Sequence, residues 1–441
     1  MKKATLDPTD ENILQTIKDN GTGGRNKEIK EFVETLDMIE DNMFLSLDAE
    51  WGVGKTFYVK QLEKTLEYHT LKKFGTDNNE NQCKYNKLHE YFKETNLEDV
   101  DIKKSYFPVY YNAWLYDNQG DPLLSLISVI VKKYGKVDTK LHESFKSKVK
   151  ELISSVSVSH KGVSVNGAGV VNATSNKDIL GEIQLAEDIQ DKVKEIFDYI
   201  ISGNVDKLVI FIDELDRCRP SYALELLERI KHYFDDDRII FIVSLNKEQL
   251  THTITNYYGT GFDATGYLNK FFDLEIYLPV VQNVDGIITD YNASQYWLNT
   301  IANALIKYYK LTLRDALIYK QRIEMLSDDP MIEDNSRDFS CKGLCMSTFI
   351  PIIIILDMKS SEEKNKFVRG ESNILEKLKV IPEVSQLYER FGKDGYEKLK
   401  ALYEYIFVDE NEEILKKVGL SYRNIGNNVK YECLRRIGLR K

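Results

Sequence analysis

A lysine and a threonine that follow two closely spaced glycines are the residues best placed for chemistry on a phosphate. Residues 44–56 read Phe-Leu-Ser-Leu-Asp-Ala-Glu-Trp-Gly-Val-Gly-Lys-Thr. This order predicts a buried strand, a tight turn and the start of a helix, whose backbone N–H groups bind phosphates. Lys55 would reach the β- and γ-phosphates, and Thr56 would bind Mg²⁺. The residues expected to contact a nucleotide are Trp51, Gly52, Val53, Gly54, Lys55, Thr56 and Phe57.

The glycine turn departs from the usual phosphate-binding pattern at one position. The first glycine of that pattern, five residues before Gly54, is Ala49 in this chain. A short Gly-x-Gly-Lys-Thr string also arises by chance, so a second motif is needed to identify the site.

Two acidic residues at the end of an apolar run supply that second motif. Residues 207–214 read Lys-Leu-Val-Ile-Phe-Ile-Asp-Glu, which predicts a buried strand followed by Asp213 and Glu214. In open α/β sheets ligands bind beyond the carboxyl ends of the strands. Asp213 is therefore expected to hold Mg²⁺ through water, and Glu214 to orient and deprotonate the attacking water. The alternative is that Asp213 only caps the next helix.

Strand and helix patterns alternate through the first two thirds of the chain. Strands are predicted over 44–47, 107–114, 208–212, 239–245 and 273–278, with helices over 57–71, 123–134, 179–199, 221–234 and 247–258. This alternation predicts an α/β fold, with a parallel sheet flanked by helices. Beyond residue 279 the patterns are helical, over 293–309, 312–326, 349–358, 382–389 and 396–407, which predicts a C-terminal α-helical domain.

The domain boundaries follow from these patterns. We expect an N-terminal extension over 1–25, a core over 26–279 with insertions near 72–105 and 140–178, and a helical sensor or partner domain over 280–441. Within the second insertion, valines alternate with small polar residues over 154–176. This spacing favours a β-hairpin, and a loop or a disordered insertion also fits.

Composition limits the classes of protein that the chain could belong to. The net charge of −10 argues against a nucleic-acid binder by bulk charge, and the five scattered cysteines argue against a disulfide framework. The start of the chain is polar, which predicts no signal peptide. The most apolar run, over 344–358, is shorter than the roughly 20 residues of a membrane-spanning helix. We therefore expect a cytoplasmic protein without a membrane span.

The run Phe-Ile-Asp-Glu-Leu-Asp-Arg-Cys-Arg-Pro over 211–220 resembles the Walker B signature of the KAP family of P-loop NTPases. Residues 51–56 are similar to the family's Trp-Gly-x-Gly-Lys-Ser/Thr loop, and residues 111–117 to its Asn-Ala-Trp segment. Residues 226–246 resemble its helix and sensor strand, and residues 267–279 its Tyr-Leu-x-Lys-Phe motif. Together these motifs cover about residues 26–279.

The resemblance implies a P-loop fold of the additional-strand branch, related to the AAA+ and STAND ATPases, that binds and hydrolyses ATP with Mg²⁺. Animal members of the family carry membrane spans between the two Walker motifs, whereas this chain is too polar there to cross a bilayer. Bacterial members often resemble phage-exclusion proteins, which implies a role in antiviral defence.

The resemblance also points to further site residues. Asn246 ends the sensor strand where the family often has an acid, and it could bond the γ-phosphate or the attacking water. Arg314 opens a C-terminal helix and is the candidate for a second sensor on the γ-phosphate; the alternative is a solvated helix residue. Four basic residues are candidates for supplying a positive charge to the site of a neighbouring protomer: Arg217, Arg219, Arg229 and Lys270. For the arginines, the alternative is a salt bridge to Asp216 or Glu228.

Trp51 could support the nucleotide or anchor the loop in the core, and the core is favoured for both Trp51 and Trp114. The final residues 416–441 hold eight basic residues against one acidic residue, so they could contact nucleic acid or an acidic partner. The first hypothesis is an ATP-driven molecular switch or motor that self-associates or engages a protein effector. The alternatives are a nucleotide-gated scaffold with little turnover and a small-molecule kinase.

Overall fold

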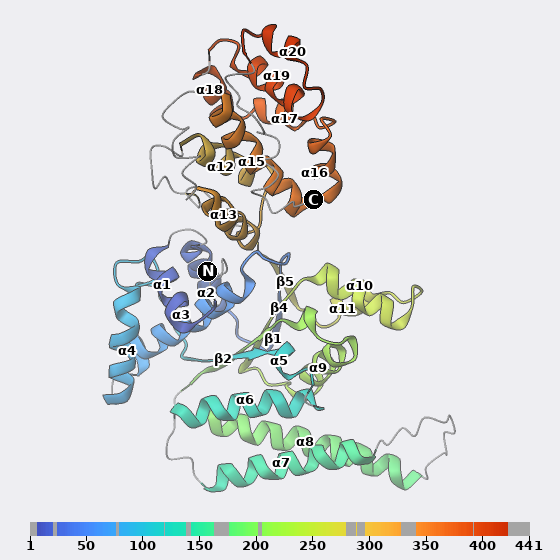
Figure 1. Ribbon diagram of the computed structural model, residues 1–441. Helices are drawn as coiled ribbons and strands as arrows, with labels where there is room; N and C mark the ends of the chain where they lie inside the picture. Colours follow the sequence, from blue (N-terminus) through green and yellow to red (C-terminus); the bar gives the residue numbers. More distant parts are fainter. Residues whose placement is uncertain are drawn as a thin grey trace. The chain divides into compact units, whose positions relative to one another are not determined.

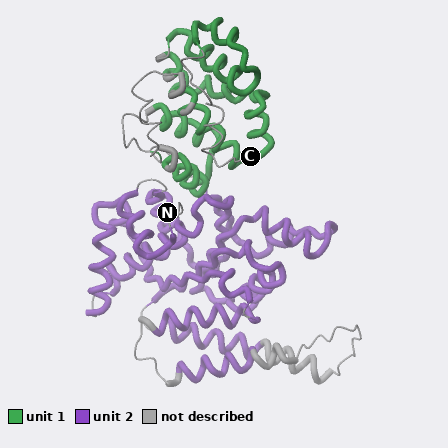
Figure 2. Tube along the Cα trace, in the orientation of Figure 1, with its two compact units in different colours: residues 1–6, 281–441 green, residues 7–280 purple. Residues whose placement is uncertain are grey.

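The structure is a computed structural model that describes residues 7–20, 24–75, 79–118, 120–137, 143–162, 176–201, 205–278, 288, 296–327, 341–390 and 392–421. The chain divides into two compact units (Figure 2). The first, here called the N-terminal unit, comprises residues 7–280. The second, the C-terminal unit, comprises residues 281–441 with residues 1–6.

A parallel sheet of five strands forms the centre of the N-terminal unit (Figure 1). The strands are β1 (Met43–Asp48), β2 (Tyr106–Asn112), β3 (Lys207–Asp213), β4 (Ile239–Leu245) and β5 (Leu274–Tyr277). Their order is β2-β3-β4-β1-β5, so β4 lies between the strand before the glycine turn and the strand that ends in the acids. The predicted parallel α/β fold is confirmed.

Helices cover both faces of the sheet because successive residues of a strand point to opposite sides. On β3, Val209 and Phe211 belong to the core that includes residues of α1 (Asp10–Asp19), α2 (Asn26–Asp37), α3 (Lys55–Phe74) and α4 (Asn79–Phe92). Leu208 and Ile210 belong to the opposite core, with α6 (Pro122–Val137), α7 (Glu143–Gly162), α8 (Asn176–Ile201), α9 (Pro220–Tyr233), α10 (Lys247–Tyr258) and α11 (Ala264–Asn269).

Two predictions of secondary structure within the N-terminal unit are wrong. The predicted strand over 107–114 ends at Asn112, because the Asn112 side chain accepts a hydrogen bond from the Leu115 N–H at 3.0 Å and caps the short helix α5 (Ala113–Tyr116). The hairpin expected from residue 154 is helix α7 as far as Gly162, where Leu152 and Val156 are four residues apart and both buried. Residues 163–175 lie outside the described part of the chain.

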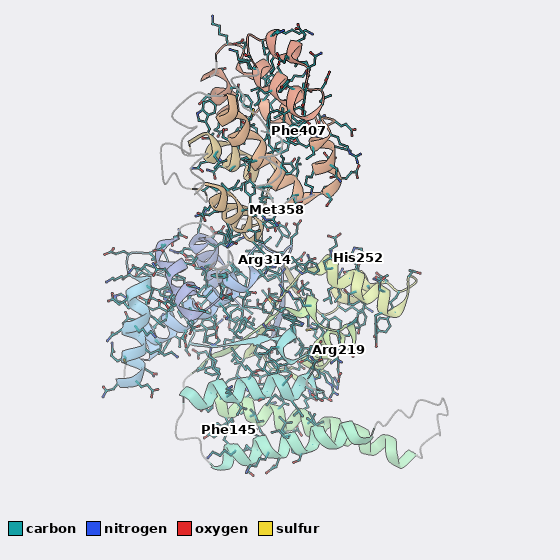
Figure 3. All side chains as sticks on the ribbon, in the orientation of Figure 1. Phe145, Arg219, His252, Arg314, Met358 and Phe407 are labelled. Atoms are coloured by element: carbon teal, nitrogen blue, oxygen red, sulfur yellow. The ribbon has the colours of Figure 1, made fainter. Side chains whose placement is uncertain are left out.

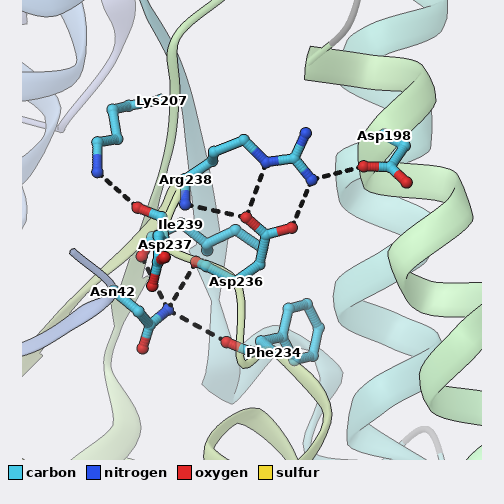
Figure 4. Close-up of polar contacts among 8 residues, drawn as sticks. All are labelled: Asn42, Asp198, Lys207, Phe234, Asp236, Asp237, Arg238 and Ile239. Atoms are coloured by element: carbon cyan, nitrogen blue, oxygen red, sulfur yellow. Dashed lines mark hydrogen bonds and ion pairs between the residues drawn. The ribbon is translucent and has the colours of Figure 1, made fainter. Parts of the chain in front are cut away.

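A set of polar contacts fixes the amino ends of the strands, opposite the predicted site (Figure 4). The Asn42 amide donates to the carbonyls of Phe234, Asp236 and Ile239 at 3.1, 3.1 and 2.9 Å. Arg238 pairs with Asp236 and, on α8, with Asp198, both at 2.5 Å. Lys207 donates to the carbonyls of Glu40 and Asp237. The starts of β1, β3 and β4 are thereby tied together.

The described residues of the C-terminal unit form helices and no strands, which confirms the predicted helical region. The helices are α12 (Tyr296–Tyr308), α13 (Leu313–Ser327), α15 (Cys341–Lys359), α16 (Ser361–Val368), α17 (Ile374–Lys379), α18 (Pro382–Arg390), α19 (Gly395–Phe407) and α20 (Glu412–Lys416). Their core centres on α15, where every residue over 349–356 is buried. Among the helices in the described ranges, none combines the length and the apolar character that crossing a bilayer requires. Of the basic tail, residues 422–441 lie outside the description.

Candidate nucleotide site

The turn between β1 and α3 has the backbone of a phosphate-binding loop. Gly52 and Gly54 have φ angles of 86° and 98°, a left-handed region that disfavours residues with a Cβ. Helix α3 begins at Lys55, directly after Gly54, so its first N–H groups face the turn. Val53 is buried beneath the loop, and Phe57 is half-buried on the first turn of α3. The fit to a phosphate is thus a property of the backbone.

The Lys55 ammonium is bound to the loop itself. Its Nζ donates to the carbonyl of Ala49 at 2.6 Å and to that of Glu50 at 3.3 Å. Burial lowers the pKa of Lys55, while Asp216 and Asp213 act in the opposite direction. A cation held by neutral carbonyls beside these acids is available to an incoming phosphate group.

The two sequence motifs meet at Thr56 and the acids after β3. The Thr56 hydroxyl donates to Glu214 Oε1 at 3.3 Å. Asp213, only 1% exposed, accepts a hydrogen bond from the Tyr110 hydroxyl of β2 at 3.0 Å. Burial and the Asp213 carboxylate raise the pKa of Tyr110, so this phenol remains a donor. The structure therefore brings Lys55, Thr56 and both acids to one edge of the sheet.

Glu214, half-buried directly after β3, has an unusual backbone conformation. Its φ of 64° lies in the left-handed region, which a residue with a side chain seldom adopts. Burial raises the pKa of its carboxyl group, with a further contribution from Asp213, and Arg217 counteracts the rise. Arg217 forms an ion pair with Glu214 and places its guanidinium over the ring of Trp114, 5.6 Å from the centroid.

The salt-bridge partners suggested for the arginines are wrong. Arg217 pairs with Glu214 rather than with Asp216. Arg219, labelled in Figure 3, contacts Asp117 at 3.2 Å. Arg229 pairs with Glu225 at 3.2 Å and with Asp121 at 3.7 Å. These partners lie before or on α9, and the sequence spacing did not indicate them. Lys270 is exposed at the end of α11.

The core positions expected for two tryptophans are also wrong. Trp51 is 49% exposed and Trp114 is 54% exposed. The Trp51 indole donates to Asp216 Oδ2 at 2.5 Å, and the same oxygen accepts from the backbone N–H of Asn246 at 3.1 Å. The Asn246 side chain accepts from the Gln249 N–H at 3.0 Å and caps α10.

Two polar residues near the loop were missed by the sequence interpretation. Tyr110 is one, and a tyrosine in an apolar strand was a usable indication because its buried hydroxyl needs a partner. The other is Arg25, 3% exposed, whose Nη2 lies 3.5 Å from the Val53 carbonyl and whose guanidinium lies over Tyr58. Burial lowers the pKa of Arg25. Arg314 follows the first residue of α13 in the C-terminal unit (Figure 3), and its sensor role stays a prediction.

Comparison with known proteins agrees with this geometry. The model of the KAP family P-loop domain matches residues 25–286, more than half of the chain. A search of curated proteins gave no match. The matched range contains the glycine turn, the acids after β3 and all five strands. The chain therefore belongs to the KAP family of P-loop NTPases.

Proposed function

We propose that this chain is a Mg²⁺-dependent ATPase that acts as a molecular switch. The observation that carries the proposal is the hydrogen bond from Thr56 to Glu214, next to the buried Asp213. It joins the phosphate-binding turn to the two acids that hydrolysis requires. ATP rather than GTP is inferred from the family.

The residues present suit a magnesium ion. Mg²⁺ prefers oxygen ligands and keeps several waters, and the Thr56 hydroxyl and Asp213 carboxylate supply such oxygens. When bound, the ion would neutralise charge on the phosphates. Lys55 would exchange its carbonyl partners for phosphate oxygens, and the N–H groups of the turn would orient the triphosphate.

Glu214 is the proposed general base. A base works best with a pKa near the working pH, and the raised pKa of Glu214 moves in that direction. In its ionised form the carboxylate would orient the water that attacks the γ-phosphate. Asn246 is proposed to contribute its amide, and Arg314 to sense the γ-phosphate.

One contact favours a second candidate function, a nucleotide-gated scaffold with little turnover. Arg217 pairs with Glu214, so the carboxylate is already occupied by a cation. A base engaged in this way is a weaker base toward water. In this scaffold, ATP binding would control assembly with a second copy or an effector, and hydrolysis would be slow.

The biological setting proposed here rests on family membership. Defence against phage is the proposed role, with nucleic acid or a protein effector as the partner. Cells carrying the wild-type chain should resist phage in a plating assay, and cells carrying Glu214→Gln should not. Equal plating in both cases would contradict this role.

The biochemical test compares nucleotide binding with phosphate release in the full chain. We expect wild type to bind ATP and release phosphate with Mg²⁺, and to lose turnover in EDTA. Glu214→Gln should bind ATP with turnover reduced by about 10²-fold or more. Lys55→Ala should lose affinity. Glu228→Gln, which changes an exposed glutamate on α9, is the matched control and should behave as wild type.

The outcomes separate the candidates. Turnover that Glu214→Gln abolishes supports the switch ATPase. Binding without turnover, with or without nucleic acid or cell extract, supports the scaffold. Transfer of phosphate to a metabolite would show a kinase. Absence of nucleotide binding by wild type contradicts all three.

A further inference from the structure

Asp216 joins two parts of the site that are distant in the sequence. It lies in the short 3₁₀ turn after Glu214 (Leu215–Arg217) and is 8% exposed. Its Oδ2 accepts the indole N–H of Trp51 at 2.5 Å and the backbone N–H of Asn246 at 3.1 Å. One carboxylate oxygen thus links the phosphate-binding turn to the residue that follows β4 and caps α10.

The bond to Trp51 determines where that side chain lies. A tryptophan with half of its surface in solvent is not fixed by burial alone, whereas a hydrogen bond to a carboxylate is short and strong. Conversely, a buried carboxylate is costly unless its oxygens are bonded. The two groups therefore hold each other, and the pair fixes the turn against β4.

Under the proposed function, the contacts of the same stretch of backbone would change when a nucleotide binds. Lys55 now holds the carbonyl of Glu50, the residue before Trp51. Gly52, with its positive φ, follows Trp51 directly. When Lys55 exchanges the Glu50 carbonyl for a phosphate, the turn is released at Glu50 and stays anchored at Trp51.

We propose that Asp216 is a positioning residue for the nucleoside triphosphate, acting through Trp51. The Trp51–Asp216 bond keeps the turn open for phosphate while Lys55 moves, and through Asn246 it aligns the turn with β4. This inference rests on the proposed function, because it assumes that the turn binds a triphosphate.

The test measures affinity for the Mg²⁺ complex of a non-hydrolysable ATP analogue, by calorimetry on the full chain. Asp216→Ala should bind about tenfold more weakly than wild type, since a charge-assisted hydrogen bond is lost. Trp51→Phe removes the same bond and keeps an aromatic ring, so it should lose a similar factor. Combining the two should add little. Asp216→Asn keeps an acceptor oxygen and should recover part of the affinity.

A matched control distinguishes positioning from stability. Asp37 is also 8% exposed, and it accepts hydrogen bonds from the Lys103 N–H and the Tyr106 hydroxyl, at the amino end of β2. Asp37→Ala should lower the melting temperature and leave affinity unchanged. Trp51→Phe provides the answer even if Asp216→Ala does not fold.

Three results decide the matter. A loss of affinity in Asp216→Ala and Trp51→Phe that is not additive supports the inference. Wild-type affinity in both variants, with only a lower melting temperature, overturns the inference and leaves the ATPase proposal intact. Absence of binding by the wild-type chain overturns both.

Discussion

Glu214 shows how a single residue is set by neighbours that the sequence does not place beside it. Burial and Asp213 raise the pKa of its carboxyl group, and Arg217 opposes the rise. Arg217 in turn lies over the exposed ring of Trp114. The basicity of the proposed base therefore depends on a cation three residues further along the chain and on an aromatic residue from α5.

Arg217→Ala is expected to change the pH dependence of hydrolysis. Removing the cation takes away the larger of the two effects that lower the pKa of Glu214, the other being the hydrogen bond from Thr56, so that pKa moves higher. Glu214 must be ionised to accept a proton, and activity is lost as the pH falls through its pKa. The acid limb of the kcat profile should therefore move to higher pH, as measured by phosphate release across a pH series.

The matched control for this profile is Arg219→Ala. Arg219 is two residues away and contacts Asp117 instead of Glu214. Its removal should leave the acid limb in place. A profile for Arg217→Ala that superimposes on that of wild type would contradict the electrostatic role of Arg217, and loss of activity at every pH would indicate an arginine that acts on the phosphates.

At the scale of the element, the turn between β1 and α3 depends on glycine for its backbone angle. An added Cβ at Gly54 would meet no atom within 4 Å, so the φ of 98° is the only obstacle to a side chain. Gly54→Ala should cost roughly 1–2 kcal/mol of stability. We also expect weaker ATP binding by calorimetry, because the strained turn would relax away from the phosphate-binding shape.

Gly259 allows the effect on the site to be separated from the strain. Its φ is 101°, and an added Cβ there would also meet nothing within 4 Å, but it caps the carboxyl end of α10. Gly259→Ala should cost at least as much free energy of unfolding, because its ψ of 159° lies in a region essentially restricted to glycine, and should keep wild-type affinity. Equal losses of affinity in the two variants would indicate a general loss of stability.

A complementary prediction concerns the amino ends of the strands, opposite the candidate site. The Asn42 amide bonds three carbonyls at the amino ends of the strands (Figure 4). Asn42→Ala leaves those carbonyls without this donor, and should lower the free energy of unfolding by about 1–3 kcal/mol in a denaturant titration. Asn42→Asp should lower the free energy of unfolding further, since a carboxylate would face the carbonyl oxygens. Nucleotide affinity should be unchanged in both.

The elements that could be predicted from sequence are those whose pattern is local. Strand β3 is an unbroken apolar run, and its two ends were predicted within one residue. Helix α7 was missed over 154–162 because valines favour strands in isolation, whereas burial of Val156 against the α8 side of the core decides its conformation. The partners of Trp51 and Glu214 could not be predicted, since they depend on how the turn after β3 approaches the glycine loop.

At the scale of the whole molecule, the chain has separate hydrophobic cores. The buried residues of the C-terminal unit form one cluster, and those of the N-terminal unit form two, one on each face of the sheet. Among the described residues, none of these clusters contains members of both units. Units with separate cores need not unfold in a single step.

We therefore expect two transitions in scanning calorimetry of the full chain, and only one of them should respond to nucleotide. A ligand at 100 times its Kd stabilises the state that binds it by about 2.7 kcal/mol. Because the candidate site lies in the N-terminal unit, the Mg²⁺ complex of a non-hydrolysable ATP analogue should raise the transition temperature of that unit. Ile210→Ala, in β3, should lower the free energy of unfolding of the N-terminal unit by about 2–5 kcal/mol, and with it the temperature of this transition. Ile353→Ala, in α15, should do the same for the C-terminal unit and its transition. A single transition that nucleotide and both variants shift together would show that the two cores unfold as one.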